Sequence, residues 1–465
     1  MLMEYVSTRG GIEPVTFRES VMMGLARDGG LLLPASLPDV RDRLAAWRKL
    51  QYGDLAYEIM SLYTDLPSAS LRDLIRRSYA TFRHAEVTPV RRIGGFHLVE
   101  LFHGPTLAFK DVALQFLGNL FQDVLTQDRR RLNILAATSG DTGSAAIWGV
   151  RGMDRIRIFV LHPHGRVSSI QERQMTSVLD GNVFNLAVDG TFDDCQRIMK
   201  ELFKDLAFKD RLSLGAVNSI NWARLLAQVV YYFYAGFRVM EETGAERVRF
   251  SVPTGNFGDI FAGWIAARMG LPIGRLVLAT NENDILSRFF KTGEYSLGAV
   301  HATISPSMDI QVASNFERYL YYRVGESAGR LTSLMSGFEA AGRLSVPPHA
   351  DGTIDPLFVA GAADTEATLA TIRECWEEHG YLLDPHTAVG VHVGLQQPHG
   401  DAPLICLATA HPAKFPDAIR EATGRDIAHN PLLDRLAGME TRCEVVPASV
   451  EAVRRYMEAT CDPKS

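Results

Sequence analysis

From about residue 90 onward, short apolar runs alternate with longer segments of helical spacing, and this alternation restricts the possible folds more than any other feature. The clearest runs are apolar enough to be strands buried on both faces, and they are Asn133–Ala137, Arg157–Leu161, Val248–Val252, Leu276–Ala279 and Leu404–Ala408. The helical segments are Thr142–Val150, Asp193–Lys204, Trp222–Glu242, Asp259–Met269 and Pro416–Ala422. Strands that alternate with helices are typical of parallel sheets covered by helices, so we predict an α/β fold.

Residues 1–90 have a different pattern. Phe17–Ala26 and Leu55–Leu62 have helical spacing, while Asp28–Pro34 is typical of a turn followed by an extended run. We therefore predict a separate, mainly helical leading domain. Further along the chain, the Gly- and Pro-containing stretch Pro347–Pro356 is interpreted as a loop inside the main region, not as a linker between domains.

The charge balance excludes a broad positive surface. Lys and Arg total 48 while Asp and Glu total 54, which gives a formal net charge of −6. Such a chain has no general affinity for a nucleic-acid backbone, and we expect no nucleic-acid partner. Arg129, Arg130 and Arg131 form a local basic cluster ahead of an apolar run, and we interpret them as the solvated entry to a strand.

The cysteines indicate a reduced protein. There are five, an odd number, and none lies in a CxxC pair or at a Cys/His spacing typical of zinc sites. We therefore expect neither a disulfide framework nor a metal site. The N-terminus lacks the basic and apolar segments of a signal peptide, and no run of about 18 apolar residues occurs, so we predict a cytoplasmic protein with no membrane partner.

The turn after the predicted strand Asn133–Ala137 combines small and hydroxyl residues, which are Thr138, Ser139, Gly140, Asp141 and Thr142. It leaves a strand and opens a helix, so free backbone N–H groups there can meet a carboxylate or a phosphate. The same residue types are common helix N-caps. Taken alone, the turn fits a simple capped helix start equally well.

A second turn, Pro253–Asp259, is rich in glycine. Gly255 and Gly258 permit positive φ and close approach of the backbone, which a loop needs to hold a phosphate with main-chain N–H groups. The turn matches neither the Rossmann nor the P-loop motif. Because glycine turns are frequent in α/β proteins, this turn by itself is a weak indication.

A third turn follows the predicted strand Leu404–Ala408. Thr409 stands at the carboxyl end of this strand, where open α/β sheets place ligands, and its hydroxyl can hydrogen-bond a ring nitrogen. His411 and Lys414 are either ligand contacts or ordinary loop and helix-start residues, and the pattern does not distinguish the two.

Lys110 is the remaining chemical group, and an apolar stretch follows it from Val112 to Leu117. Burial disfavours an ammonium ion, so this setting predicts a lowered pKa and a nucleophilic amine. For the lysine alone, a surface pair with Asp111 is the alternative. The combination of an amine, an anion-binding turn, a glycine-rich phosphate loop and a strand-end hydroxyl matches the needs of pyridoxal phosphate (PLP), and we predict that cofactor.

Several motifs resemble the threonine synthase family with a long N-terminal domain, in the superfamily of the tryptophan synthase β subunit and threonine deaminase. They cover nearly the whole chain and are Tyr5–Gly10, Leu25–Gly30, Phe102–Asp111, Thr138–Gly143, Asn218–Arg224, Pro253–Gly258 and Thr409–Phe415. The resemblance implies PLP fold type II. It also implies an N-terminal domain over 1–90, a catalytic region of two interleaved α/β domains over 91–430 and a helical tail over 431–465.

The resemblance implies roles for individual residues. Lys110 would be the catalytic residue that forms the internal aldimine, Thr409 would face the pyridine nitrogen, and Asp141 would lie near the phenolic oxygen. The cofactor phosphate would be bound by Gly255, Asn256, Phe257 and Gly258, and Asp259 would be a further cofactor-binding residue. The substrate α-carboxylate would be received by the turn of Thr138, Ser139, Gly140, Asp141 and Thr142.

For the substrate phosphate we expect Ser219, Asn221 and Arg224, with Ser307 and Asn315 as weaker candidates. The stretch Asn218–Arg224 also has a structural interpretation, because Asn and Ser before a long apolar helix are good caps.

The family reaction converts O-phospho-L-homoserine and water into L-threonine and phosphate, by γ-elimination followed by addition of water at the β carbon. Lys110 is predicted to move the α and β protons because its tethered amine is within reach of both. A neutral Thr409 cannot stabilise a pyridinium as a carboxylate does. The electron sink is therefore weaker, which favours elimination over transamination.

Two alternatives remain open on the sequence. A phospho-lyase on the same scaffold would release phosphate, ammonia and a 2-oxo acid instead of completing water addition. A non-catalytic protein that binds small molecules is the other alternative, and the presence of Lys110 argues against it. In either enzymatic case we expect a small-molecule substrate and a monomer or homodimer.

Overall fold

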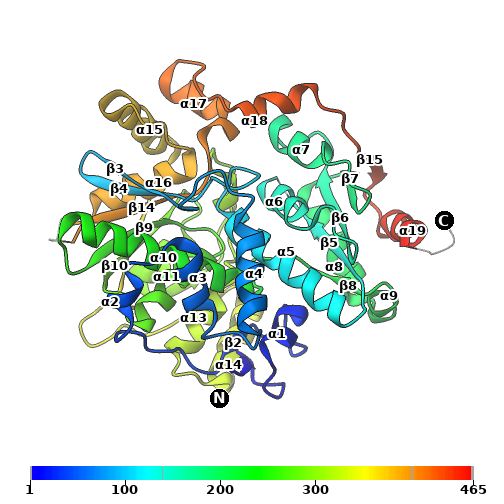
Figure 1. Ribbon diagram of the computed structural model, residues 1–465, viewed down its shortest axis with the longest axis horizontal. Helices are drawn as coiled ribbons and strands as arrows, with labels where there is room; N and C mark the ends of the chain where they lie inside the picture. Colours follow the sequence, from blue (N-terminus) through cyan, green and yellow to red (C-terminus); the bar gives the residue numbers. More distant parts are fainter. Residues whose placement is uncertain (1–2, 139, 399–401, 462–465) are drawn as a thin grey trace. The chain divides into compact units, whose positions relative to one another are not determined.

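The computed structural model describes residues 3–138, 140–398 and 402–461 (Figure 1). These residues divide into two compact units. Unit 1 consists of Met1–Phe109 and Ser219–Ala428, and unit 2 of Lys110–Asn218 and His429–Ser465. Each unit has its own central sheet with helices around it, which confirms the predicted α/β fold.

Unit 1 is built on a six-stranded sheet in the order β13-β10-β9-β14-β4-β3. Its strands are β3 (Val90–Ile93), β4 (Phe96–Glu100), β9 (Val248–Pro253), β10 (Ile273–Thr280), β13 (Phe358–Ala362) and β14 (Leu404–Ala408). All neighbouring pairs are parallel except β3 with β4. Because β9 and β14 are parallel neighbours, the loop after β9 and Thr409 after β14 lie at the same edge of this sheet.

From residue 222 onward, helices surround the unit 1 sheet. They are α10 (Trp222–Thr243), α11 (Gly258–Met269), α12 (Ile285–Thr292), α13 (Phe316–Arg323), α14 (Ala328–Ala341), α15 (Thr365–His379), α16 (Pro385–Gln396) and α17 (Pro416–Thr423), with short 3-10 turns at Pro306–Met308 and Pro412–Lys414. A small antiparallel pair joins β11 (Glu294–Ser296) to β12 (Arg343–Ser345). Helix α16 packs against β9, β10 and β14, while α10 is buried along most of its length because it is apolar on all sides.

The leading segment of unit 1 is mainly helical, as predicted. Its elements are β1 (Tyr5–Ser7), α1 (Phe17–Met23), β2 (Leu32–Pro34), α2 (Leu44–Trp47), α3 (Tyr52–Met60) and α4 (Ser68–Tyr79). Figure 1 shows α3 beside α10, which it contacts. Aromatic rings join the leading segment to α10, because Tyr5 lies edge-on to Trp222 and Tyr52 lies edge-on to Tyr234.

Unit 2 contains a five-stranded, fully parallel sheet in the order β15-β7-β6-β5-β8. Its strands are β5 (Leu132–Ala137), β6 (Ile156–Pro163), β7 (Val183–Asp189), β8 (Leu214–Gly215) and β15 (Glu444–Pro447). Its helices are α5 (Lys110–Gln127), α6 (Asp141–Val150), α7 (Ser169–Thr176), α8 (Phe192–Lys204), α9 (Leu206–Arg211), α18 (Pro431–Asp434) and α19 (Val450–Cys461), with a 3-10 turn at Arg435–Gly438.

Helices α5 and α6 of unit 2 pack backbone to backbone. A Cβ atom on Gly118 would overlap the carbonyl of Gly149, and one on Gly149 would lie 2.6 Å from the carbonyl oxygen of Leu114. Only glycine permits this approach at both positions. Lys110 begins α5 and Asp141 begins α6, so this contact fixes the two helices that carry these residues.

The predicted elements are confirmed, and the differences lie mostly at their ends. The helix predicted over Phe17–Ala26 ends at Met23, because Gly24 adopts positive φ and terminates it. The stretch Pro347–Pro356 contains no helix or strand, as expected. The tail over 431–465, expected to be helical, also contributes β15, which pairs with β7 because Val445 and Val446 extend along that edge.

The segment boundaries at about residues 90 and 430 stay predictions. Among the helices of the described residues, none combines the length and the apolar composition that a membrane crossing requires.

Candidate cofactor and substrate site

Lys110 lies at the start of α5 in unit 2 and is 8% exposed. Its Nζ is 3.9 Å from Oδ2 of Asp141, which begins α6 and is also buried. The apolar residues that follow Lys110 are buried as well, which confirms the predicted apolar setting. The structure thus gives this amine an adjacent carboxylate that can hold it as an ammonium ion or take up its proton.

Asp141 is oriented by a residue that the sequence analysis missed. Gln171 donates a hydrogen bond from Nε2 to Oδ1 of Asp141 at 2.9 Å. Gln171 is itself held by Ser168, whose hydroxyl donates to Oε1 at 3.0 Å and accepts from the Gln171 N–H at 3.3 Å. One oxygen of Asp141 therefore faces Lys110 while the other is fixed by Gln171.

The turn before α6 uses Thr138 to hold its own shape. Oγ1 of Thr138 accepts from the N–H groups of Gly140 at 3.0 Å and Gly143 at 2.9 Å. Gly140 has φ of 148°, and a Cβ there would lie 2.5 Å from the side chain of Gln171. Thr142 lies in the first turn of α6, where backbone N–H groups have no intrahelical acceptor. Ser139 lies outside the described residues.

In unit 1, the loop Gly255–Gly258 joins β9 to α11 and is crowded at both glycines. A Cβ on Gly255 would lie 2.8 Å from the carbonyl oxygen of Ser307, and one on Gly258 would lie 3.1 Å from Nδ2 of Asn315. Phe257 has φ of 65°, in the left-handed region. Such a loop leaves its main-chain N–H groups exposed at a helix start, as a phosphate cradle requires.

A polar network connects this loop to the start of α10. The hydroxyls of Ser219 and Ser314 are 2.6 Å apart, and Ser314 donates to Oδ1 of Asn256 at 3.2 Å. Asn315 donates from Nδ2 to the carbonyls of Ser219 and Asn256 at 3.1 and 3.2 Å. Two predicted residues, Ser219 and Asn256, are thus brought together.

Asp259 lies in the first turn of α11, directly after the loop. Its Oδ1 accepts hydrogen bonds from the hydroxyls of Tyr231 at 2.6 Å and Tyr232 at 2.9 Å. Burial raises the pKa of Asp259 to about 6, although both tyrosine hydrogen bonds favour the ionised form. The side chain of Asp259 therefore joins α11 to α10.

Thr409 ends β14 with its hydroxyl buried. Its side chain is 5% exposed, and Oγ1 has no hydrogen-bond partner among the described residues. The Thr409 N–H donates to Oγ1 of Thr387 at 3.1 Å, and the Thr387 hydroxyl donates to Oδ2 of Asp384. The backbone is therefore anchored while the hydroxyl is left to bind a ligand.

Asp384 also orients His386. Nδ1 of His386 lies 2.9 Å from Oδ1 of Asp384, and its Nε2 accepts from the N–H of Ser307 at 3.2 Å. Because Nε2 accepts, Nδ1 must carry the proton and donate it to Asp384. The same carboxylate thus supports both Thr409 and the segment that packs on Gly255.

The chain just before Lys110 is tied to the turn that contains Thr409. Phe109 donates its N–H to the Thr409 carbonyl at 2.8 Å, and Lys414 donates from Nζ to the carbonyl of Thr106 at 2.9 Å. His411 accepts from the N–H of Ala413 as a local cap, and burial lowers its pKa to about 4. His411 and Lys414 therefore have structural roles.

Arg224 lies in the first turn of α10 and is 5% exposed. Its Nε and one terminal nitrogen, Nη1, have no hydrogen-bond partner among the described residues. Burial lowers its pKa to about 10, so the guanidinium remains charged at neutral pH. Asn221 caps the same helix by accepting from the N–H of Ala223 and donates to the carbonyl of Val21. Arg224 is thus a buried cation that an anion would complete.

These residues fit PLP. A buried amine, a loop in which a Cβ at either glycine would be crowded, and a buried hydroxyl without a partner among the described residues correspond to its aldehyde, phosphate and ring nitrogen. Within the described residues, no group of three or more His, Cys, Asp or Glu side chains is arranged to hold a metal ion.

Comparison with known proteins covers almost the whole chain. Residues 4–79 match the family described as threonine synthase N terminus, 83–346 match pyridoxal-phosphate dependent enzyme, and 387–457 match threonine synthase, C-terminal. Threonine synthase of Pseudomonas aeruginosa is 45% identical over 463 residues, which is 98% of each chain. That of Schizosaccharomyces pombe is 47% identical over 456 residues, which is 90% of this chain and 89% of the relative.

The solved structure of PLP-bound threonine synthase from Brucella melitensis superposes with a TM-score of 0.94, at 45% identity and with 99% of each chain covered. The chain belongs to the threonine synthase family. It is therefore a PLP-dependent enzyme of fold type II, and the predictions of family, fold and cofactor are confirmed.

For this threonine synthase family member, some supporting residues had local signals that the sequence analysis did not use. Ser168 and Gln171 have the S-x-x-Q spacing of a capping box. Asp384 before Pro385 is a typical helix start, but that pattern gives no indication of its link to Thr409. Ser314 has no distinguishing signal.

Proposed function

We propose that this chain is a threonine synthase that converts O-phospho-L-homoserine and water into L-threonine and phosphate. Its family supports the reaction class. The main observation in favour of a phosphorylated substrate is the state of Arg224. Its guanidinium is buried and charged, and its Nε and Nη1 have no partner among the described residues. Guanidinium groups bind phosphate with paired, charge-assisted hydrogen bonds, so a substrate phosphate would satisfy this cation.

In this proposal Lys110 would be the covalent attachment point of PLP. Gly255, Asn256, Phe257 and Gly258, together with the first turn at Asp259, would hold the cofactor phosphate. The hydroxyl of Thr409 would hydrogen-bond the ring nitrogen. When bound, PLP supplies an electron sink for charge that develops on the substrate carbons.

Lys110 also moves protons in the proposed mechanism. Its amine, tethered at the start of α5, takes the proton from the α carbon and serves the β carbon in turn. Asp141, at 3.9 Å, stabilises the ammonium form of Lys110 between these transfers. Gln171 positions Asp141 and therefore acts through it.

The substrate is held at its two anionic ends. The start of α6, with Gly140 and Thr142, receives the α-carboxylate through backbone N–H groups, while Thr138 maintains the turn. Ser139 belongs to the same proposed set. At the other end Arg224 binds the phosphate, with Ser219 beside it and Asn221 holding the helix start.

The neutral partner at the ring nitrogen is proposed to direct the reaction. A threonine hydroxyl would stabilise a protonated cofactor ring less than a carboxylate does, and the weaker electron sink would favour elimination over transamination. A Thr409→Asp variant should form more transamination product, and unchanged partitioning would contradict this part of the proposal.

One assay tests the reaction. Purified, PLP-loaded protein is incubated with O-phospho-L-homoserine, and threonine, free phosphate and 2-oxobutyrate are measured together. Equal amounts of threonine and phosphate are expected. Phosphate with 2-oxobutyrate and ammonia would identify a phospho-lyase, and no phosphate release would reject the substrate.

The proposal retains the broader expectations from the sequence. We place a leading domain over 1–90, a catalytic region of two interleaved α/β domains over 91–430 and a tail over 431–465. The enzyme would act in the cytoplasm on small molecules, as a monomer or homodimer, without a nucleic-acid or membrane partner.

A further inference from the structure

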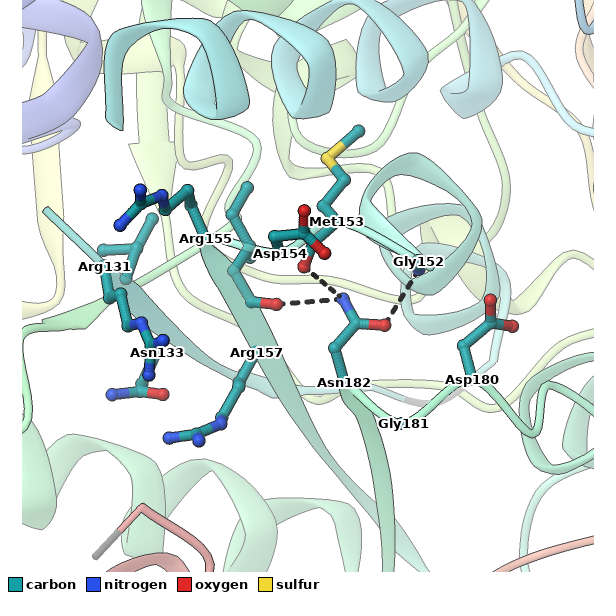
Figure 2. A pocket seen from close by; sticks show the side chains of 12 residues that line it. Arg131, Asn133, Gly152, Met153, Asp154, Arg155, Arg157, Asp180, Gly181 and Asn182 are labelled. Carbon is teal, nitrogen blue, oxygen red and sulfur yellow. Dashed lines mark hydrogen bonds between the residues drawn. The ribbon is translucent and has the colours of Figure 1, made fainter. Parts of the chain in front are cut away.

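A cavity of about 330 Å³ lies in unit 2 at the amino ends of β5 and β6 (Figure 2). The candidate residues of the same unit stand elsewhere, because Thr138 follows the carboxyl end of β5. The lining residues that matter most are Arg131, Asn133, Arg155, Arg157, Asp180 and Asn182. The cavity is therefore a separate feature of the unit 2 sheet.

The register of the two strands explains why three arginines gather here. Asn133 of β5 pairs with Arg157 of β6, and Leu132 pairs with Ile156. Arg131 and Arg155 directly precede these two strands, and the Leu132 N–H donates to the Arg155 carbonyl at 2.9 Å. The three arginines therefore lie at neighbouring strand starts. Figure 2 shows the three arginines on the left of the cavity and Asp180 on the right.

The arginines of this cavity have no carboxylate partner among the described residues. Arg157 interacts with the thiol of Cys461, while Arg131 and Arg155 form no ion pair there. Asp180 is neutralised by Arg151 at 2.7 Å. With Asp154 as the other acidic lining residue, the positive charge is in excess.

The floor of the cavity is rigid. Asn182 donates from Nδ2 to the carbonyls of Val150 at 2.8 Å and Ile156 at 2.9 Å, and its Oδ1 accepts from the N–H of Gly152 at 2.9 Å. Dashed lines in Figure 2 mark such contacts of Asn182. Because the strand starts are fixed, the guanidinium groups are attached to an ordered backbone, which lowers the cost of binding.

We propose that this cavity binds a small phosphorylated molecule that carries two or more negative charges. Arginine side chains match phosphate oxygens in geometry and charge. The volume lies near the lower end of the range of about 300–1,000 Å³ for small-ligand sites. Arg131, interpreted from the sequence as a solvated strand entry, thus lines a site. A net charge of −6 for the chain makes this a local feature and excludes a general nucleic-acid surface.

The test uses inorganic pyrophosphate as the probe and the PLP-loaded enzyme, with calorimetry at low ionic strength. The wild type should bind the probe, and the double variant R131Q/R157Q should bind it at least tenfold more weakly. R130Q is the matched control, since Arg130 is exposed on the same strand entry and does not line the cavity. The double variant should keep its melting temperature and its activity in the absence of the probe.

Each outcome decides for or against the cavity. No binding by the wild type would overturn the proposal. So would equal weakening by R130Q, which would indicate general charge attraction. The variant R224Q separates the candidate substrate site from the cavity. If R224Q abolishes binding of the probe and R131Q/R157Q does not change it, pyrophosphate binds at the substrate site and the cavity proposal fails.

Discussion

Two regions of unit 1 are candidate phosphate sites, and they are built on opposite principles. The loop Gly255–Gly258 presents main-chain groups, and its neighbours Ser314 and Asn315 both donate hydrogen bonds to Asn256 of the loop. The first turn of α10 presents Arg224, a buried charge whose Nε and Nη1 have no partner among the described residues. The loop would bind an anion through main-chain N–H groups, whereas the first turn of α10 would bind it through a buried guanidinium charge.

This difference fits the expected residence times of the two ligands, PLP at the loop and the substrate at Arg224. A cofactor that remains bound suits a loop of backbone dipoles, which has no unpaired side-chain charge when empty. A substrate that enters and leaves in each cycle suits a cation, because the free energy of pairing a buried charge is gained only while the anion is present. We infer that the loop sets cofactor affinity and that Arg224 sets substrate affinity.

Replacing Lys110 tests whether the loop holds the cofactor by itself. We expect Lys110→Ala to lower turnover by about 10³-fold or more, because both covalent attachment and proton transfer are lost. PLP should still bind through the loop, only more weakly. Turnover assays, retention of PLP on ultrafiltration and mass spectrometry after borohydride reduction measure these effects. Wild-type activity in the variant, or an unmodified Lys110 in PLP-saturated wild type after reduction, would remove the basis of the mechanism.

Replacing Arg224 tests the other half of the comparison. Arg224→Gln should lower kcat/KM for O-phospho-L-homoserine by about 10²–10³-fold, because the substrate phosphate loses a buried charged partner. PLP binding should not change. The control is Arg238→Gln on the same helix, since Arg238 donates to the carbonyls of Arg48 and Leu50. A loss of PLP without a change in kcat/KM at saturating PLP would reverse the assignment.

Adding a methyl group to the loop should affect the cofactor and spare the substrate. Gly255→Ala places a Cβ 2.8 Å from the Ser307 carbonyl oxygen, so either the loop or the backbone at Ser307 must shift. We expect PLP affinity to fall by about tenfold to a hundredfold and KM at saturating PLP to stay nearly constant. Gly337→Ala is the control, because a Cβ there meets nothing within 4 Å. Fluorescence titration with PLP measures the affinity.

The smallest effect concerns Asp259, the acid behind the loop. Its pKa is raised to about 6 in the folded chain, so the folded state binds this proton more tightly than the unfolded state. The associated stability is present at low pH and is lost as the pH rises through about 6, by about 1 kcal/mol between about pH 5.5 and 7.5. In the variant Asp259→Asn, this part of the loss of stability with rising pH should be absent. Melting temperatures of both proteins at the two pH values measure it, and parallel pH profiles would contradict it.

Much of this arrangement could be predicted from local sequence. The strands, the helices and the burial of Lys110 follow from runs of apolar residues. The supporting contacts could not be predicted in the same way, because they join distant segments. Gln171 reaches Asp141 from another helix, and Asp384, in the turn between α15 and α16, supports Thr409 through Thr387. The same holds for Arg224, because the packing of the interior leaves its Nε and Nη1 without a hydrogen-bond partner among the described residues.

The close contact between α5 and α6 has a consequence for engineering this enzyme. Lys110 and Asp141 each stand at the first position of one of these helices, and the main chains touch at Gly118 and Gly149. The distance between the amine and the carboxylate therefore depends on how closely the two helices approach, at a point more than two helical turns away. Directed evolution that aims to retune proton transfer should therefore sample this crossing as well as the lysine's immediate neighbours.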